Sequence, residues 1–286
     1  MEIITNSQEM QKRSNAWLSA GKRIGFVPTM GALHAGHLSL VKRAKAENDI
    51  TVVSIFVNPA QFAPHEDYAR YPKNLEKDLE ILKPYAVDVV FHPDARDMFP
   101  PDFQTRIHVE KISEPLYGKV RPHFFSGVAV VVLKLFHIIN PTNAYFGEKD
   151  YQQYLVIRQM SKDLSLDVNV LPCPIVREPD GLAMSSRNAY LSPDQRRQAA
   201  LLYKALQTGS EMIKKGERNP ECVIDSMKKT INEIPQVKID YIAIADPQTL
   251  KTLSRIENEA FLGLCVQIGE TRLIDSLVVG VNTPIP

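Results

Sequence analysis

The stretch from Ile24 to Leu38 constrains this chain more than any other. An apolar run that begins at Ile24 and stops at Pro28 predicts a buried strand, a turn flanked by two glycines follows, and apolar residues at helical spacing come next. A strand, a turn and a helix in this order bring the first N–H groups of the helix and the positive end of its dipole to one point. The sequence therefore predicts a phosphate-binding turn near residues 30–37.

Two imidazoles lie in this predicted turn. The spacing Gly31-x4-Gly36 is that of a P-loop, but the Lys and Ser/Thr that should follow are replaced by His37 and Leu38, and no Gly-x-Gly-x-x-Gly is present. What remains is His-x-Gly-His, from His34 to His37, at a strand-to-helix turn. This motif resembles the ATP-binding signature of the nucleotidylyltransferase and class I aminoacyl-tRNA synthetase superfamily. In that superfamily the two histidines stabilise phosphate charge during attack at the α-phosphorus.

Two other interpretations of the histidines stay open. They could be zinc ligands, although Cys173, Cys222 and Cys265 are scattered without Cys-x-x-Cys spacing. They could also be helix-start residues without any chemistry. Three cysteines without framework spacing fit a reducing compartment, where they serve as small core residues.

Length and charge narrow the class of protein. The chain has 286 residues and a formal net charge of +1. This length favours two domains, and the near-neutral charge gives no general attraction to nucleic acid or to an acidic membrane. The N-terminus lacks the features of a signal peptide, and no run of about 18 apolar residues occurs. We therefore expect a cytoplasmic protein with small-molecule substrates and no nucleic-acid or membrane partner.

Strands and helices alternate along the first part of the chain. This alternation predicts an α/β fold with a Rossmann-like doubly wound parallel sheet. The strands are apolar throughout, as expected of parallel strands that are covered on both faces. In such sheets ligands bind beyond the carboxyl ends of the strands. The predicted strands are 24–28, 50–57, 88–91, 143–146 and 167–171, and the predicted helices are 38–46, 74–82, 127–139 and 151–160.

The character of the sequence changes after Arg177. Residues 178–181 are rich in turn formers, and one long helix is predicted to begin at Pro193 with Ser192 as its N-cap. A second helix near 223–234 and two strands, 239–245 and 261–268, complete a smaller α+β domain. We therefore expect a Rossmann-like domain over residues 1–177 and a smaller C-terminal domain over residues 178–286.

Further polar residues occur in the predicted turns. Lys149 offers a positive charge for a phosphate, residues 185–187 offer two hydroxyls and a guanidinium, and Gln61 offers an amide for a carboxylate or hydroxyl. Each of these is also ordinary loop composition, so each could be a solvated surface residue.

Taken together and in order, these stretches resemble the pantothenate synthetase (pantoate–β-alanine ligase) family over essentially the full length. The matching segments are Pro-Thr-Met-Gly-Ala-Leu-His-Ala-Gly-His at 28–37, Ser-Ile-Phe-Val-Asn-Pro-Ala-Gln-Phe at 54–62, Tyr-Phe-Gly-Glu-Lys-Asp-Tyr-Gln-Gln at 145–153, Val-Arg-Glu-Pro-Asp-Gly-Leu-Ala-Met-Ser-Ser-Arg-Asn at 176–188 and Thr-Arg-Leu-Ile-Asp at 271–275.

The resemblance implies a ligase that condenses (R)-pantoate with β-alanine through a pantoyl adenylate, using ATP and Mg²⁺ and releasing pyrophosphate and AMP. It implies that His37 donates a proton, that His34 and Lys149 act with it on the phosphates, and that Gln61 and Gln153 hold pantoate, with Gln61 also near β-alanine. The residues implied to bind ATP are Met30, Gly31, Ala32, Leu33, His34, Ala35, Gly36, His37, Gly147, Glu148, Lys149, Asp150, Val176, Met184, Ser185, Ser186 and Arg187. Few carboxylates stand in these motifs, so we expect the phosphates of ATP to hold Mg²⁺ and predict no protein ligand for a metal.

One segment departs from the family pattern. The family reads Arg-Pro-x-His-Phe-x-Gly-Val, whereas this chain has Phe124 in the place of the histidine and His123 one residue early. In an extended segment His123 would point away from the site, and we expect Arg121 to contribute a phosphate contact. The family also implies a homodimer. Another adenylyl- or cytidylyltransferase, a tRNA-binding module and a non-catalytic nucleotide sensor remain alternatives.

Overall fold

The computed structural model describes residues 1–64 and 66–281 and divides into two compact units. The first unit comprises residues 1–113, 121–148 and 153–174. The second unit comprises residues 114–120 and 149–152 and the chain from Ile175 onward. Among the described residues, no helix combines the length and the apolar character needed to cross a membrane.

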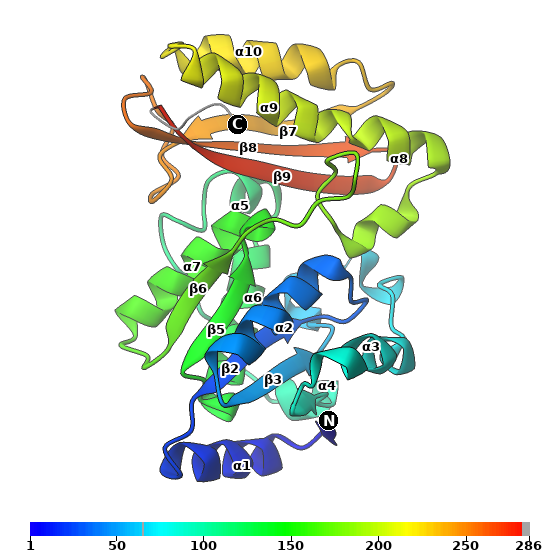
Figure 1. The fold of residues 1–286 in the computed structure, drawn as a ribbon, viewed down its shortest axis with the longest axis vertical. Coiled ribbons are helices and arrows are strands. Elements are labelled where there is room, and N and C mark those ends of the chain that lie inside the picture. Colours follow the sequence, from blue (N-terminus) through cyan, green and yellow to red (C-terminus); the bar gives the residue numbers. More distant parts are fainter. Residues whose placement is uncertain (65, 282–286) are drawn as a thin grey trace. The chain divides into compact units, whose positions relative to one another are not determined.

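A parallel sheet forms the centre of the first unit (Figure 1). Its strand order is β1-β4-β3-β2-β5-β6, and the order reverses between β2 and β5, as in a doubly wound fold. The predicted α/β fold class is therefore confirmed, and the sequence analysis missed only the short edge strand β1. The strands are β1 (Glu2–Ile4), β2 (Ile24–Thr29), β3 (Ile50–Ile55), β4 (Val89–Phe91), β5 (Asn143–Gly147) and β6 (Asn169–Cys173).

Helices cover both faces of this sheet because adjacent residues of its strands point to opposite sides. Val27 belongs to the buried cluster that includes Val41 and Ala44 of α2 (Ala35–Glu47). Its neighbour Phe26 packs edge-on against Phe136 of α6 (Phe124–Ile139), with 6.3 Å between ring centroids. The other helices of this unit are α1 (Ser7–Ser19), α3 (Leu75–Leu82), α4 (Ala95–Met98) and most of α7 (Tyr151–Asp163).

Pro28 is accommodated inside β2 because the pairing of β2 with β5 is short. Strand β2 pairs with β3 over all six of its residues but with β5 only through Gly25 and Phe26. The missing N–H of Pro28 therefore breaks no bond toward β5. Beyond Phe26, β2 and β5 no longer pair with each other. In doubly wound sheets, ligands bind at such a point, where the strand order reverses.

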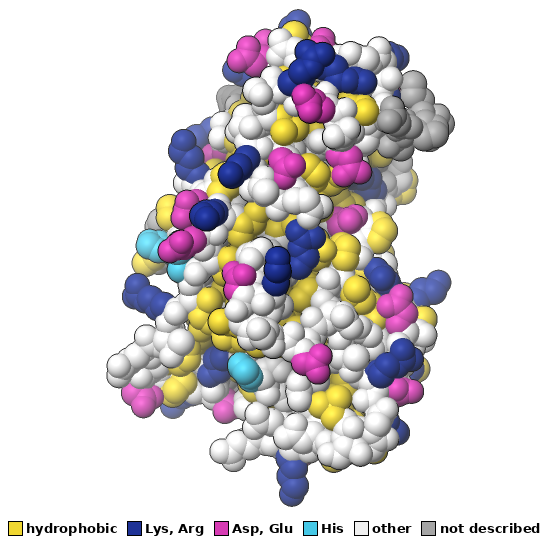
Figure 2. Space-filling view, turned by 90° about the vertical axis from the view of Figure 1, so that its left-hand side faces the viewer, with side chains coloured by type: hydrophobic (Ala, Val, Ile, Leu, Met, Phe, Trp, Pro, Cys, Tyr) yellow, Lys and Arg dark blue, Asp and Glu magenta, His cyan; other side chains and the backbone are white. Residues whose placement is uncertain are grey.

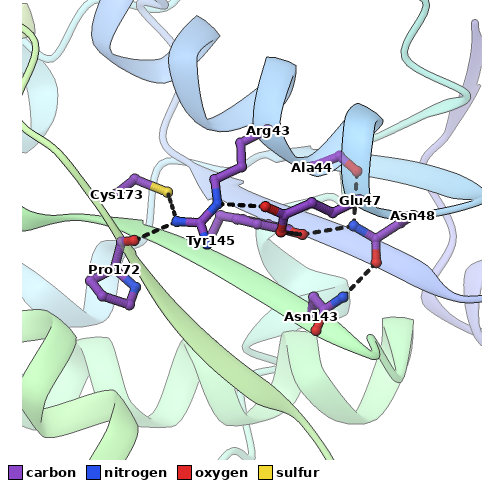
Figure 3. A network of polar contacts seen from close by, with 8 residues as sticks. All are labelled: Arg43, Ala44, Glu47, Asn48, Asn143, Tyr145, Pro172 and Cys173. Atoms are coloured by element: carbon purple, nitrogen blue, oxygen red, sulfur yellow. Dashed lines mark hydrogen bonds and ion pairs between the residues drawn. The ribbon is translucent and has the colours of Figure 1, made fainter.

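A polar network anchors the C-terminal half of α2 to β5 and β6 (Figure 3). The Arg43 guanidinium donates to Glu47 (2.9 Å) and to the carbonyl of Pro172 (2.7 Å), and the Tyr145 hydroxyl donates to Glu47 (2.8 Å). Asn48 donates in turn to the Tyr145 hydroxyl (2.8 Å). Burial and the Glu47 carboxylate raise the pKa of Tyr145 to about 12. This network holds α2 on the sheet, and α2 is the helix whose first residues carry the two histidines.

The second unit is built on an antiparallel sheet whose order is β7-β8-β9, with α9 and α10 across one face (Figure 1). The α+β character is confirmed, but two details were wrong. A third strand, β9, was missed, and the single long helix is two helices that meet at Ala200. The elements are α8 (Pro193–Ala199), α9 (Leu201–Lys214), α10 (Pro220–Ile231), β7 (Lys238–Ala245), β8 (Glu259–Ile268) and β9 (Thr271–Gly280), together with the short α5 (Tyr117–Val120).

Candidate functional site

The turn between β2 and α2 is held by hydrogen bonds to its own backbone. Gly31 and Ala32 have positive φ angles of 82° and 51°, which turns the chain sharply after Thr29. The carboxylate of Asp78 accepts from the N–H groups of Ala32 (3.0 Å) and Leu33 (2.8 Å). These two N–H groups precede the first turn of α2, and α3 brings a carboxylate to them. These bonds fix the turn before the two histidines.

Both histidines accept a backbone hydrogen bond through Nδ1. Nδ1 of His34 accepts from the N–H of Gly36 (3.2 Å), and Nδ1 of His37 accepts from the N–H of His34 (3.3 Å). A neutral imidazole whose Nδ1 accepts must carry its proton on Nε2. The two rings lie 4.1 Å apart between centroids. The fold therefore gives both imidazoles the same tautomer, with Nε2–H as the donor.

The eight residues predicted to bind ATP in this motif occupy the turn and the first residues of α2. His34 is the N-cap of the helix. Ala35 is exposed, while Met30, Ala32, His34, Gly36 and His37 are half-buried and Gly31 and Leu33 are buried.

Gln61 lies at the end of a short 3-10 helix, η1 (Pro59–Gln61), directly after β3. Its Oε1 accepts from Nδ2 of Asn58 (2.9 Å), and the same Nδ2 donates to the carbonyl of Gly127 (3.0 Å). Asn58 is only 1% exposed. The buried amide thus orients the Gln61 side chain and leaves it half-buried. Gln153 is also half-buried and lies in the first turn of α7.

The segment after β5 carries the second predicted nucleotide motif. Gly147 ends β5, and a 3-10 helix, η4 (Glu148–Asp150), follows. Burial raises the pKa of Glu148. Lys149 is 20% exposed and lies 3.6 Å from the carboxylate of Asp150. A partly buried lysine ammonium has three donors, so Lys149 can bind a phosphate in addition to Asp150.

In the second unit, the predicted residues from Val176 to Arg187 lie in and after a small hairpin. The carbonyl of Val176 accepts from the N–H of Met184 (3.0 Å). Arg177 donates two hydrogen bonds to the buried Asp275 (2.6 and 2.9 Å). Burial raises the pKa of Asp275, and the Arg177 guanidinium opposes this effect. This ion pair anchors the hairpin to β9.

The hairpin leads into the compact polar segment. Ser185 is the N-cap of the 3-10 helix η5 (Ser186–Tyr190) and accepts from the N–H of Arg187 (3.3 Å). Met184, Ser185, Ser186 and Arg187 are all half-buried. Two hydroxyls and a guanidinium therefore lie within one turn of chain, and their binding of an anion stays a prediction.

The sequence analysis missed several residues that hold these motifs. Asp78 is the clearest, since it lies among Leu75, Leu79 and Leu82 on the apolar stripe of a predicted helix, where a carboxylate is out of place. That pattern break is a signal that could have identified it. Asn58 carried no such signal, because it follows a strand and precedes a proline, as turn-forming asparagines commonly do.

The segment from Arg121 to Phe124 differs from the expectation. It is not extended: His123 has helical dihedral angles and is exposed, and α6 begins at Phe124. Arg121 is 7% exposed and bound to Glu66 and to the carbonyl of Gln61. The expected phosphate contact of Arg121 is therefore replaced, in this structure, by contacts within the protein.

Two further observations concern the distribution of potential metal ligands and of charged side chains. In the described part of the chain, no group of three or more His, Cys, Asp and Glu side chains gathers in a way that could hold a metal ion. On the face that Figure 2 shows, Lys and Arg side chains are interspersed with Asp and Glu side chains. This mixture agrees with the net charge of +1. The face shown offers no continuous basic surface of the kind that binds nucleic acid.

Comparison with known proteins gives one consistent result. Residues 2–278 match the family model described as pantoate-beta-alanine ligase. Pantothenate synthetase of Thermotoga neapolitana is 50% identical over 280 residues, which is 98% of this chain and 100% of that protein. Pantothenate synthetase of Caldicellulosiruptor saccharolyticus is 51% identical over 281 residues, with the same coverage.

Solved structures agree. Pantothenate synthetase from Thermus thermophilus superposes with a TM-score of 0.92 at 44% identity, covering 97% of this chain and 99% of that one. Pantoate-beta-alanine ligase from Francisella tularensis, complexed with beta-gamma ATP and beta-alanine, superposes with a TM-score of 0.81 at 39% identity, covering 97% of each chain. Full-length matches at this identity, together with the His-x-Gly-His turn on a doubly wound sheet, leave one assignment: the chain belongs to the pantoate–β-alanine ligase family.

Proposed function

We propose that this protein joins (R)-pantoate to β-alanine in two steps at the expense of ATP. In the first step, a carboxylate oxygen of pantoate attacks the α-phosphorus, which forms pantoyl adenylate and releases pyrophosphate. In the second step, the amine of β-alanine attacks the acyl carbon, the bond from that carbon to the AMP oxygen breaks, and the amine loses a proton as pantothenate forms. Family membership supports this reaction.

The observation that carries the proposal is the shared tautomer of His34 and His37. With Nδ1 of each ring accepting from the backbone, each neutral ring offers an Nε2–H donor. The attacking group belongs to the substrate, so the enzyme needs no nucleophile of its own. Its task is to align the reactants and to stabilise charge that develops on the phosphates. His37 donates a hydrogen bond through Nε2–H to the departing pyrophosphate, and His34 binds a phosphate oxygen beside it.

The other motifs supply the remaining contacts. Gln61 and Gln153 hold pantoate through their amides, and Gln61 also lies near β-alanine. Lys149 is the point charge on the transferring phosphate. The remaining ATP contacts are those that the family resemblance assigns to the backbone and side chains of residues 30–37, 147–150, 176 and 184–187.

The phosphate oxygens of ATP would hold most of the coordination of Mg²⁺, which would shield their charge. The donor set of the motifs fits this arrangement, because its imidazoles, ammonium, hydroxyls and guanidinium outnumber its two carboxylates, Glu148 and Asp150. We assign pantoate binding and most of the ATP contacts to residues 1–177, and the remaining ATP contacts to residues 184–187. Residues 178–286 act as a lid that keeps water from the adenylate, which is a mixed anhydride. In line with the family, we further propose a cytoplasmic homodimer, which sedimentation analysis would test.

Mass spectrometry of the reaction mixture tests the proposal. Pantothenate and AMP should form in equal amounts only when ATP, pantoate and β-alanine are all present. If β-alanine is present as well, release of pyrophosphate with pantoate but without an amide product would instead favour another nucleotidyltransferase of the same superfamily. Retardation of tRNA at low salt would favour the tRNA-binding alternative.

A further inference from the structure

Glu66 and Arg121 form a buried ion pair beside the turn that carries Gln61. Nε of Arg121 donates to Oε1 of Glu66 (2.6 Å), and Nη2 donates to Oε2. Their side chains are 15% and 6% exposed, respectively. Burying two charges has a large desolvation cost, so such a pair contributes little net stability unless further hydrogen bonds complete it. The partners that complete this pair therefore indicate what it is for.

Those partners are backbone groups of the segment from Gln61 to Glu66. The Arg121 guanidinium donates a third hydrogen bond, from Nη2 to the carbonyl of Gln61 (2.9 Å). The Glu66 carboxylate accepts from the N–H of Ala63 (2.8 Å). Arginine presents its donors in a rigid planar fork, so these bonds fix direction as well as distance. The ion pair thus clamps the backbone of Gln61 from one side.

Helix α6 also contacts this turn. A Cβ on Gly127 would lie 2.1 Å from the carbonyl oxygen of Ala60, so the turn rests directly on the helix backbone. Asn58 donates both to the carbonyl of Gly127 and to Oε1 of Gln61. The main-chain carbonyl of Gln61 is therefore held by Arg121, and its side-chain amide is held separately by Asn58.

Phe124 supports the guanidinium. Cζ of Arg121 lies 4.4 Å from the centroid of the Phe124 ring. An arginine stacks well on an aromatic face, where its donors stay available around the edge. This ring occupies the position at which the chain departs from the family pattern of a histidine. The departure therefore places a flat apolar surface under Arg121 instead of a second polar group.

From these contacts we infer that Arg121 is a positioning residue for pantoate, acting through Glu66 and the carbonyl of Gln61, and not a ligand of the ATP phosphates. The inference rests on the proposed function, in which the Gln61 amide holds pantoate. It extends that function by naming which buried charges hold the main chain of the residue whose amide binds pantoate.

Steady-state kinetics of Arg121→Lys and Glu66→Gln, with pantoate and ATP varied separately, test this inference. Lysine keeps the positive charge but has no fork to reach Glu66 and the Gln61 carbonyl together. We expect the KM for pantoate to rise about tenfold in each variant, as when a hydrogen bond in a binding site is weakened, while the KM for ATP stays within about twofold. Arg13→Gln is the matched control, because Arg13 pairs with Glu2 in an exposed ion pair, and it should change neither KM.

The double variant Arg121→Gln, Glu66→Gln is the control for misfolding of the single variants. Each single glutamine leaves one buried charge unpaired, whereas the double variant leaves none, so it should be at least as stable and as active as Arg121→Gln alone. A raised KM for ATP with an unchanged KM for pantoate, or additive losses in the double variant, would overturn the inference. The wild-type enzyme separates this failure from failure of the proposed function, since a wild type that makes no pantothenate would refute the function itself.

Discussion

The carboxylate of Asp78 accepts a hydrogen bond from the backbone N–H of Leu33 over 2.8 Å. Its second oxygen accepts from the N–H of Ala32. Because Asp78 is only 3% exposed, water cannot readily replace either bond. Helix α3 therefore determines the shape of the turn that presents His34 and His37, although it carries none of the predicted site residues.

Replacing Asp78 by Asn tests this dependence. An amide has one acceptor oxygen, so its NH2 group would face one of the two backbone N–H groups. We expect the free energy of unfolding to fall by about 1–3 kcal/mol and adenylate formation to slow in the protein that remains folded. Denaturant titration and pyrophosphate release measure the two effects.

Asp49→Asn is the control for Asp78→Asn. Asp49 also accepts from a backbone N–H, that of Arg23 (2.8 Å), but it is exposed and lies at the amino end of β3. Its replacement should leave pyrophosphate release unchanged. Equal rates in the two variants would show that the turn does not depend on Asp78.

The second prediction concerns His37. Replacement by Ala should lower the rate of adenylate formation by about 10²–10³, or about 2.7–4 kcal/mol, the loss typical of one well-placed donor to a developing charge. Asn can keep an acceptor for the N–H of His34 but lacks the Nε2–H donor, so His37→Asn should restore stability without restoring the rate. Single-turnover measurements within about threefold of wild type for either variant would refute the assigned role.

Lys149 and Gln61 should fail in different ways. Lys149→Ala removes a charge that acts on the transferring phosphate, so it should lower turnover. Gln61→Ala removes a contact to pantoate, so it should mainly raise the KM for pantoate. Initial rates over a grid of ATP and pantoate concentrations distinguish the two. Identical changes in both variants would contradict the separate roles.

The network around Tyr145 gives a prediction for alkaline pH. Folding raises the pKa of Tyr145 from the ordinary value of 10.0 to about 12, so the folded state binds this proton more tightly than the unfolded state does. The resulting stability is fully present below pH 10 and is lost as the pH rises through about 12.

Tyr145→Phe removes both the hydrogen bonds and this dependence. It should lower the free energy of unfolding by about 0.5–1.5 kcal/mol near neutral pH for each hydrogen bond lost. The difference from wild type should shrink between pH 10 and about 12. Denaturant titrations across that range check this, and a difference that stays constant would argue against the raised pKa.

Much of the fold could be predicted because its signals are local. The β-branched run from Ile50 and the apolar stripe of α6 each determine one element without reference to the rest of the chain. Strand β9 was missed because Arg272 and Asp275 interrupt its apolar pattern. In the structure those charges are paired, Arg272 with Asp240 and Asp275 with Arg177. Their partners are distant in sequence, so no local pattern reveals them.

The candidate site also contains residues that a local pattern predicts and residues that no local pattern reveals. Residues of the contiguous motifs, such as His34 and His37, could be identified because the motif itself carries the chemistry. Asp78, Glu66 and Arg121 act through hydrogen bonds to backbone groups that lie outside their own motifs, and for Asp78 and Arg121 those groups are dozens of residues away. The expected phosphate contact of Arg121 was carried over from the family pattern, and in the structure its guanidinium is bound to Glu66 and to the carbonyl of Gln61.

The most direct test of the proposed reaction follows the carboxylate oxygens of pantoate. If pantoate carrying oxygen-18 in its carboxylate attacks the α-phosphorus, one labelled oxygen must leave with AMP when the β-alanine amine displaces it. Mass spectrometry should therefore find one oxygen-18 in AMP, one in the new amide and none in pyrophosphate. AMP without the label, or label in inorganic phosphate formed together with ADP, would contradict an adenylate intermediate.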